Sequence, residues 1–199
     1  MSFFLVSLII GFSTTIIVNF IFAFSWNTIL DLFICFSVVM LPAGVFLFVG
    51  RALPKKFFND NNKLFIVGNF KNKICNISKV KLWKDLIPVG GRIAGFRLNK
   101  LTCPNNIEYL DRFIYESCFA EWLHFTAFVW SFIAIFLLPK NLLFKMTLPI
   151  SLLFAYQNIT SVIIQWFVRP RIVKLRDKMK IKQFTKDKEE ISESVEVTS

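Results

Sequence analysis

The stretch Gln157–Ile172, QNITSVIIQWFVRPRI, is apolar for most of its length, but four polar side chains interrupt it at regular intervals. An α-helix turns by ~100° per residue, so Gln165 and Arg169 point within ~20° of the direction of Asn158. Ser161 lies on a neighbouring part of the same face, and the other faces carry Ile, Val, Trp and Phe. The spacing predicts a membrane helix with one polar stripe (Asn158, Ser161, Gln165 and Arg169) that faces another helix instead of lipid.

Two interpretations of this polar stripe are open. Amide and hydroxyl side chains join transmembrane helices at ~0.6 kcal/mol per hydrogen bond, and an arginine at a helix end is an ordinary interfacial anchor. Alternatively, the stripe lines a polar site, because Asn158 lies ~16 Å below Arg169 and therefore near the middle of the membrane.

The composition is typical of a membrane protein. Hydrophobic residues make up 55% of the 199 residues, 25 residues are Phe, and the mean hydropathy is +0.56. A soluble domain of this length rarely is so apolar. The net charge of +11 lies almost wholly outside the apolar runs, which predicts contact with anionic lipid headgroups. The chain has no nucleic-acid-binding motif, so nucleic acid is not an expected partner.

Four apolar runs are each long enough to cross a bilayer as a helix. They cover residues 3–24, 29–49, 119–138 and 144–168, and the first two form a predicted hairpin within residues 1–50. Residues 51–116 are a predicted basic cytosolic or interfacial loop, residues 117–168 a two-span core, and residues 169–199 a cytosolic tail. The predicted fold is an all-α integral membrane bundle of four transmembrane helices with a cytosolic amphipathic segment.

Two prolines and the C-terminal residues add detail to the predicted fold. Pro149 is expected to kink the fourth span, and Pro170 to change the chain direction at the membrane exit, since proline removes a helical donor and restricts the preceding residue. From Lys186 on, the chain has few large apolar groups and is predicted to be disordered.

A single long helix is predicted for residues 107–138. Asn105 or Asn106 is suited to cap its N-terminus, and Glu108 is suited to its first turn.

Glu121 and His124 lie on one face of this helix where it enters the membrane, and Glu116 precedes His124 by two turns on roughly the same side. Charged groups are costly there, which makes them functional candidates. One interpretation is general-base catalysis by His124, with a carboxylate that fixes its tautomer. The other is a Glu-His pair that only hydrogen-bonds within the bundle.

Neither a metal site nor a disulfide is expected. A di-metal bundle built on E-x-x-H needs a second such motif and more carboxylates, and the four cysteines form no C-x-x-C pair. The H-x-x-x-x-D pattern of glycerolipid acyltransferases is absent, because Val129 stands where the Asp would be. No tightly bound cofactor is expected.

Three segments resemble the signature regions of the glycosyl-4,4'-diaponeurosporenoate acyltransferases, bacterial membrane enzymes that complete staphyloxanthin-type carotenoids. ESCFAEWLHF is similar to E-T-x-x-A-E-x-x-H through Glu116, Ala120, Glu121 and His124. NITSVIIQWFVRPRI is similar to N…Q-R-Y-N-R-P-R through Asn158, Gln165, Arg169, Pro170 and Arg171. LWKDLIPVGG is similar to W-K-D-x-x-P through Trp83, Lys84, Asp85 and Pro88. The chain departs from the family pattern at Ser117, Trp166 and Val168.

The resemblance implies an acyltransferase that moves a fatty acyl group onto a sugar hydroxyl of an apolar glycolipid, a carotenoid glycoside in that family. Acyl-CoA or a similar acyl donor would be the co-substrate. In our hypothesis for the site, His124 deprotonates the acceptor hydroxyl and Glu121 orients it. Arg169 and Arg171 hold donor phosphates, because guanidinium forks match phosphate oxygens.

Other residues complete this hypothesis. Asn158 and Gln165 line the inner wall and bind the sugar or the developing oxyanion. The further substrate-binding candidates are Glu116, Trp83, Lys84 and Asp85. Two alternatives stay open: a non-enzymatic membrane assembly or channel subunit, and another lipid-modifying transferase on the same scaffold.

The lysines and arginines predict the orientation in the cell membrane. Thirteen of the 24 lie in residues 51–116 and nine in residues 169–199, which places both termini and the long loop in the cytosol. Residues 79–100 are expected to lie along the headgroups, with Val80, Trp83 and Ile87 on one face of an interfacial helix.

Cysteine labelling tests this orientation. A membrane-impermeant thiol reagent added outside intact cells should label neither Ser78→Cys nor Ser194→Cys, because both positions are predicted to be cytosolic. Labelling of either position from outside would contradict the topology.

Overall fold

The computed structural model describes residues 13, 17, 26–84 and 101–197, and all the regular elements in these residues are helices. They are α2 (Trp26–Ala52), η1 (Lys55–Phe57), α3 (Asn69–Ile77), α4 (Val80–Trp83), α5 (Ile107–Leu137), η2 (Lys140–Leu142), η3 (Leu143–Thr147) and α6 (Leu148–Val197). The all-α prediction is confirmed for this part of the chain. The predicted first span, residues 3–24, lies almost entirely outside the described residues.

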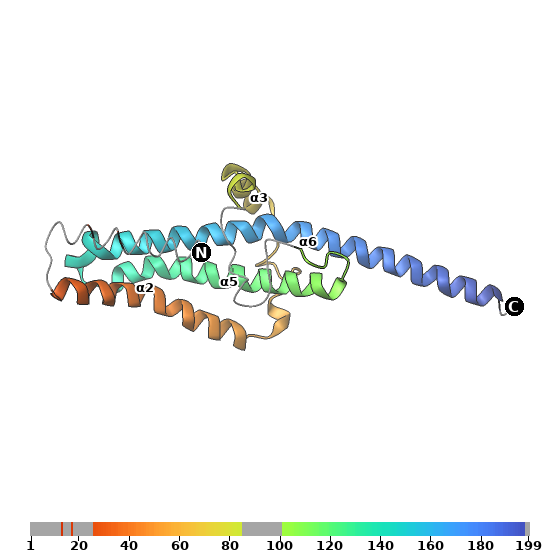
Figure 1. Ribbon diagram of the computed structural model, residues 1–199, viewed down its shortest axis with the longest axis horizontal. Helices are drawn as coiled ribbons and strands as arrows, with labels where there is room; N and C mark the ends of the chain where they lie inside the picture. Colours follow the sequence, from red (N-terminus) through yellow and green to blue (C-terminus); the bar gives the residue numbers. More distant parts are fainter. Residues whose placement is uncertain (1–12, 14–16, 18–25, 85–100, 198–199) are drawn as a thin grey trace.

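Three of these helices, α2, α5 and α6, are long and apolar enough to cross a membrane. They lie side by side along the long axis of the molecule, and α6 extends well beyond the other two (Figure 1). In the most apolar stretch of each helix, the buried share is 61% for α6, 17% for α2 and 22% for α5. α6 is therefore the central helix, whereas α2 and α5 turn apolar side chains outward, where lipid can solvate them.

The ends of α5 follow from its sequence. The Asn106 side chain accepts a hydrogen bond from the Tyr109 backbone N–H at 2.9 Å, and Glu108 lies in the first turn, where a carboxylate is favoured. Pro139 follows the other end and prevents the helix from continuing. These features confirm the long helix predicted for residues 107–138.

Pro42 lies inside α2, where its missing N–H leaves the Val38 carbonyl without its helical donor. Trp130 of α5 supplies that donor, because its indole Nε1–H donates to the Val38 carbonyl oxygen at 2.9 Å. A proline is tolerated in a membrane helix when a neighbouring helix satisfies the freed carbonyl in this way. The bond also helps to set the register between α2 and α5.

Pro149 and Pro170 both lie inside α6. The π-helix η3 ends at Thr147 and α6 begins at Leu148, so the backbone changes from π to α winding directly before Pro149. The predicted kink at Pro149 stays a prediction. α6 continues through Pro170 as one helix, and the predicted change of direction there stays a prediction. Contacts beyond Pro170 hold the helix in place: Ile172 packs in a core with residues of α5, and Arg176 pairs with Asp60 at 2.8 Å.

The C-terminal tail is helical as far as Val197, which corrects the prediction of disorder from Lys186 on. After Pro170 the chain contains neither proline nor glycine, and it is rich in lysine and glutamate. Both residue types are good helix formers and can pair across one helical turn, so the helix propagates outward from the packed part of α6.

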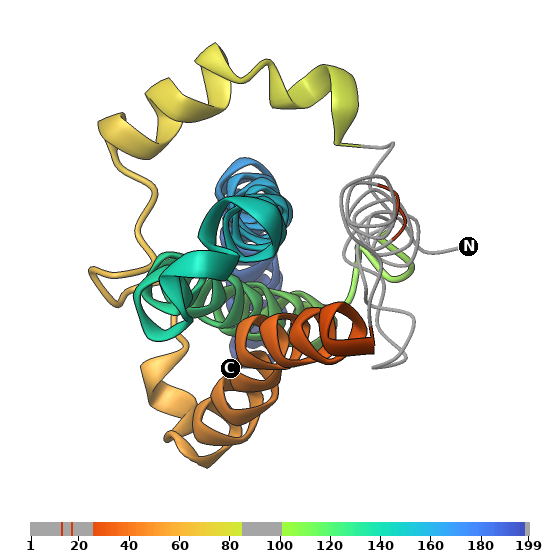
Figure 2. The same cartoon turned by 90° about the vertical axis from the view of Figure 1, so that its left-hand side faces the viewer.

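Residues 54–84, which we call the arm, leave the end of α2 and curve round the bundle (Figure 2). The arm carries α3 and α4 on the side of α6 that faces away from α2. Cys75 and Val80 are buried against apolar residues of α6. The face shared by Val80 and Trp83 therefore packs on a helix and not on lipid. Contact of the rest of this segment with headgroups stays a prediction, and Ile87 lies outside the described residues.

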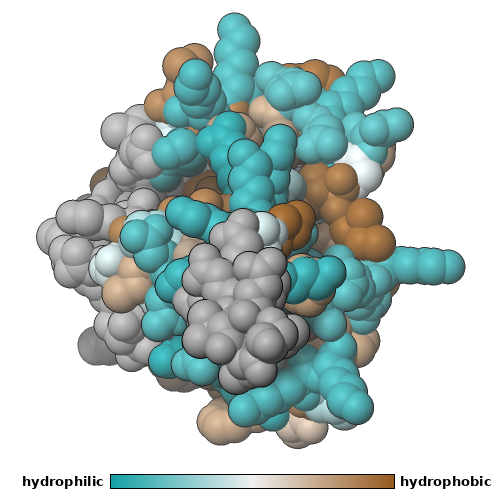
Figure 3. All heavy atoms as spheres, turned by 90° about the vertical axis from the view of Figure 1, so that its right-hand side faces the viewer, coloured by the Kyte–Doolittle hydropathy of each residue, from teal (hydrophilic) through white to brown (hydrophobic). Residues whose placement is uncertain are grey.

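The end of the molecule from which α6 protrudes presents mainly hydrophilic side chains (Figure 3). It contains the start of α5 and the second half of α6, which are joined there by ion pairs of Arg176 and Lys180 with Asp111. Apolar helices with one polar end match the division between membrane and water that the sequence predicts. The side of the membrane that this end faces stays a prediction.

Gly50 of α2 lies against two aromatic rings of α5. A Cβ added at Gly50 would lie 2.7 Å from Trp122 and 2.8 Å from Phe119. We expect Gly50→Ala to push α2 away from α5 and to lower the free energy of unfolding by ~1–3 kcal/mol. Gly44→Ala on the same helix is the control, because a Cβ there meets nothing within 4 Å. Thermal unfolding in detergent should show a lower midpoint for Gly50→Ala alone, and equal midpoints would contradict this packing.

Candidate active site

The polar stripe of α6 faces α5, as predicted. Three of its four side chains bond across the interface, in the contacts Asn158 to His124, Gln165 to Ser117, and Arg169 to Ser117 and Glu121. Ser161 instead donates to the Gln157 carbonyl of its own helix at 3.1 Å. α5 and α6 therefore share a polar seam, formed by these cross-interface contacts.

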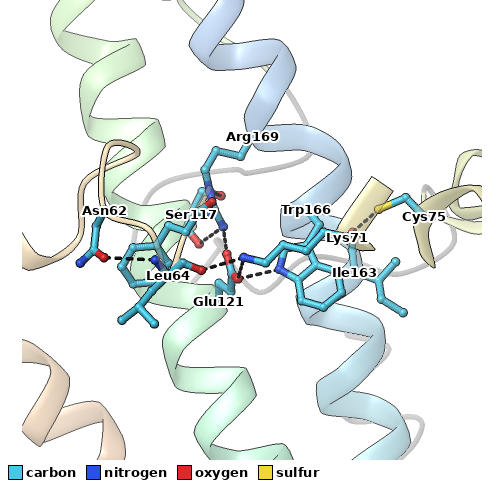
Figure 4. Close-up of polar contacts among 10 residues, drawn as sticks. Asn62, Leu64, Lys71, Cys75, Ser117, Glu121, Ile163, Trp166 and Arg169 are labelled. Atoms are coloured by element: carbon cyan, nitrogen blue, oxygen red, sulfur yellow. Dashed lines mark hydrogen bonds and ion pairs between the residues drawn. The ribbon is translucent and has the colours of Figure 1, made fainter. Parts of the chain in front are cut away.

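The carboxylate of Glu121 accepts three hydrogen bonds, from three different side chains. Arg169 donates to it through Nη2, Lys71 through Nζ at 2.9 Å, and Trp166 through Nε1 at 2.6 Å (Figure 4). The side chains of Glu121 and Arg169 are only 7% and 2% exposed. These four residues, which we call the Glu121 cluster, come from α3, α5 and α6.

Arg169 uses all three nitrogens of its guanidinium inside the protein. Besides its bond to Glu121, it donates from Nε to the Ser117 hydroxyl at 3.1 Å and from Nη1 to the Phe65 carbonyl at 2.8 Å. Because Phe65 belongs to the arm, this one side chain joins the arm to α5 and α6. The predicted phosphate-binding role of Arg169 is therefore corrected: the guanidinium is buried and makes four hydrogen bonds inside the protein, so it holds these segments together.

Glu121 does not orient His124, contrary to the prediction. Its Oε1 accepts from Lys71 and Trp166, and its Oε2 accepts from Arg169. The two cations draw the carboxylate away from the imidazole, although the spacing of the two residues places them on one helix face. One carboxylate shared by two cations also leaves the Glu121 cluster with an excess of positive charge.

His124 is held by Asn158 instead. Asn158 donates from Nδ2 to the Phe154 carbonyl at 2.8 Å, so the amide atom 2.9 Å from His124 Nδ1 is Oδ1, which can only accept. His124 therefore donates from Nδ1–H, and the neutral ring carries its lone pair on Nε2. If the Asn158 amide were flipped, its Oδ1 would face the Phe154 carbonyl oxygen, and neither atom could donate. The contacts therefore select this amide orientation, and with it this tautomer of His124.

Two further predicted residues do not join the polar seam. Glu116 forms an ion pair with Arg51 of α2, with an N···O distance of 3.4 Å. Arg171 is exposed, and its guanidinium lies 3.9 Å from the centre of the Phe167 ring. Two residues after Arg169, it points ~200° away around α6, so the two arginines cannot hold one phosphate together.

The W-K-D segment also lies away from His124 in the structure. Trp83 is half-buried and donates from Nε1 to the Ser78 carbonyl at 2.7 Å, which closes the turn between α3 and α4. Lys84 follows directly after α4. Asp85 lies outside the described residues.

Sequence reasoning missed three residues of this site, Lys71, Ser117 and Trp166. Ser117 precedes His124 by seven residues, so helical spacing placed it on the same face. Ser117 and Trp166 are also positions at which the chain departs from the family pattern. No periodicity pointed to Lys71, which lies 50 residues from Glu121 along the chain.

Cys75 lies near the Glu121 cluster but is not suited to act as a nucleophile. Burial raises the pKa of its thiol, and Sγ donates to the Ile163 carbonyl at 3.8 Å. The thiol therefore stays protonated at neutral pH, whereas the thiolate is the reactive form. All four cysteines are unpaired, as predicted.

Comparison with known proteins gives one match. The sequence matches the family model described as glycosyl-4,4'-diaponeurosporenoate acyltransferase over residues 54–178. The matched range covers the arm, α5 and the packed part of α6, and so contains every residue of the polar seam. No curated protein and no solved structure gave a significant match.

Removing the Glu121 charge should destabilise the fold. Glu121→Gln leaves the buried Arg169 and the half-buried Lys71 without a carboxylate, and loss of one partner of a buried pair costs about 3–5 kcal/mol. Glu116→Gln is the control, because its partner Arg51 is 45% exposed and such pairs contribute about 1 kcal/mol or less. Unfolding midpoints in detergent should separate the two variants clearly.

A second substitution makes this test specific. Lys71→Met in the Glu121→Gln background removes one uncompensated cation and should recover part of the lost stability. Equal losses for Glu121→Gln and Glu116→Gln, with no recovery, would show that the Glu121 cluster does not hold the fold.

Proposed function

The chain belongs to the glycosyl-4,4'-diaponeurosporenoate acyltransferase family, and on that premise we propose that it is a membrane-embedded acyltransferase in which His124 is the general base. The transferred group is a fatty acyl group. The acceptor is a hydroxyl of an apolar glycosylated lipid, a carotenoid glycoside by analogy with the family, and the donor is an acyl thioester such as acyl-CoA.

The contact between His124 and Asn158 carries this proposal. A general base needs a lone pair that is held in a fixed direction, and the bond from Nδ1–H to Asn158 Oδ1 leaves the lone pair on Nε2 and fixes the ring. Asn158 is itself fixed, because its Nδ2 donates to the Phe154 carbonyl. An imidazole held in this way by a neutral amide inside a membrane helix is costly to maintain for structure alone.

The reaction follows from this arrangement. The acceptor hydroxyl gives its proton to His124 Nε2 while its oxygen attacks the thioester carbonyl carbon. The resulting tetrahedral intermediate carries a negative oxygen. When the carbonyl re-forms, the carbon–sulfur bond breaks, the thiolate leaves and takes the proton from the imidazolium, and an ester and a thiol remain.

The surroundings of His124 suit an apolar acceptor. Phe125, which follows His124 on α5, is 48% exposed, so the helix surface beside His124 can be reached from lipid. The Glu121 cluster lies one helical turn from His124, and its excess positive charge favours the anionic tetrahedral intermediate. Gln165 accepts from Ser117 within the bundle, so its role is to support the polar seam instead of binding the sugar.

Substitution of His124 tests the proposal. His124→Ala should lower acyl transfer by ~10²–10⁴-fold, the usual contribution of a general base. His124→Gln should fail equally, since an amide cannot take the proton. Both variants should still insert into the membrane and unfold near the wild-type temperature. The measurement is acylated glycolipid formed per unit of membrane-inserted protein at several donor concentrations.

Two Asn158 variants serve as matched comparisons. Asn158→Asp keeps an acceptor oxygen near the place of Oδ1, so it should retain more turnover than Asn158→Ala at saturating donor. Near-normal turnover in His124→Ala would exclude the imidazole from the chemistry and leave the activity to be explained by other residues.

A further inference from the structure

The part of the arm between residues 61 and 84 carries charges of one sign only. It contains six lysines and no aspartate or glutamate. One of them, Lys71, points inward to Glu121. Of the others, Lys63, Lys73, Lys79 and Lys81 are exposed.

The same segment exposes large apolar side chains on its outer side. Phe70, Ile77 and Leu82 are 73%, 72% and 75% exposed. Phe70 and Ile77 are seven residues apart on α3, so they share one face of that helix. Cys75, on another face of α3, is buried against α6. α3 is therefore two-sided, with polar and apolar contacts to the bundle on one side and an exposed apolar face on the other.

The depth of α3 is set by its contacts with α6. Cys75 Sγ lies 3.8 Å from the carbonyl of Ile163, and Lys71 Nζ lies over the Trp166 ring at 5.3 Å from its centre. Ile163 precedes Arg169 by six residues, or ~9 Å along the helix, on the side of the long apolar part of α6. α3 is therefore level with residues that belong to a candidate membrane span.

We propose that α3 and α4 lie in the plane of the membrane, with Phe70, Ile77 and Leu82 in the hydrocarbon and the exposed lysines at anionic headgroups. An apolar face bordered by lysines is the pattern of a helix that lies in the bilayer interface. The absence of acidic residues between positions 61 and 84 favours an anionic lipid surface over a protein partner, whose surface would carry both signs of charge. This proposal does not depend on the proposed reaction.

The consequence concerns Lys71. It lies on α3 next to Phe70, yet its ammonium group bonds to Glu121 and to the Leu64 carbonyl. Lipid on the outer face and the Glu121 cluster on the inner face therefore hold the same two-turn helix. A membrane that binds the outer face of α3 therefore also keeps Lys71 in the Glu121 cluster.

Spin labels on the full chain in phosphatidylglycerol-containing vesicles test the proposal. Labels are placed at Phe70→Cys, Ile77→Cys and Leu82→Cys, in a Cys103→Ser background that removes the exposed native thiol. We expect each label to collide more with oxygen, which concentrates in lipid, than with a water-soluble nickel chelate. Phe184→Cys is the matched control: Phe184 is also apolar and 61% exposed, but it lies on the protruding part of α6, so its label should favour the nickel chelate.

Every outcome of this experiment either supports or overturns the membrane location of α3. Labels at the three arm positions that favour the nickel chelate, as at Phe184, would place α3 in water and overturn the proposal. Labels shielded from both reagents would place it under protein, such as a second copy of the chain, and would overturn it equally. Near-normal acyl transfer in His124→Ala, which would exclude the proposed base, would change none of these outcomes.

A second measurement isolates the headgroup contact. In nanodiscs, replacing phosphatidylcholine with phosphatidylglycerol should raise the unfolding midpoint of the wild type. The triple variant Lys73→Gln, Lys79→Gln, Lys81→Gln should lose this gain. The matched triple variant Lys174→Gln, Lys178→Gln, Lys182→Gln on α6 should keep it, and equal behaviour of the two would exclude headgroup binding by the arm.

Discussion

The buried ion pair between Glu121 and Arg169 is the constraint on which the rest of the structure depends. Taking two charges out of water is costly, and the cost is offset only when their remaining lone pairs and protons are also bonded. Here both oxygens of Glu121 accept bonds, and Nε, Nη1 and Nη2 of Arg169 all donate. Because the partners come from α5, α6 and the arm, satisfying this pair requires all three segments to be in one arrangement. Apolar contacts alone would not select that arrangement, since lipid is as apolar as the side chains it would replace.

The register fixed by this pair decides the geometry of the candidate active site. His124 follows Glu121 by three residues on α5, and Asn158 precedes Arg169 by eleven on α6. A slip of one residue in either helix would turn its polar face by ~100° and separate His124 from Asn158. The buried ion pair and the proposed base, His124, therefore belong to one polar seam but have different roles. The first positions the helices, and the second has a ring nitrogen, Nε2, that makes no hydrogen bond within the described residues.

The arm shows how charge is divided between the inside and the outside of the protein. Its lysines are similar in sequence, but Lys71 completes a buried cluster while its neighbours stay exposed. Sequence spacing explains the outer face, because Phe70 and Ile77 repeat at seven residues. The inner contact depends on where the arm meets α6, which only the fold defines.

The sequence by itself determined the features that arise from local chemistry. The apolar runs, the Asn106 cap, the helix end before Pro139 and the direction of the polar stripe all depend on residues within a few turns of one another. Tertiary structure decided the partners. By spacing alone His124 could have met Glu121, yet Lys71 and Arg169 draw that carboxylate away and Asn158 takes its place. Likewise Pro170 removes a helical donor, but α6 continues through it, because Ile172 and Arg176 beyond it are held by α5 and the arm. Such choices depend on charges and packing surfaces that are distant in sequence, and these meet only when the helices come together.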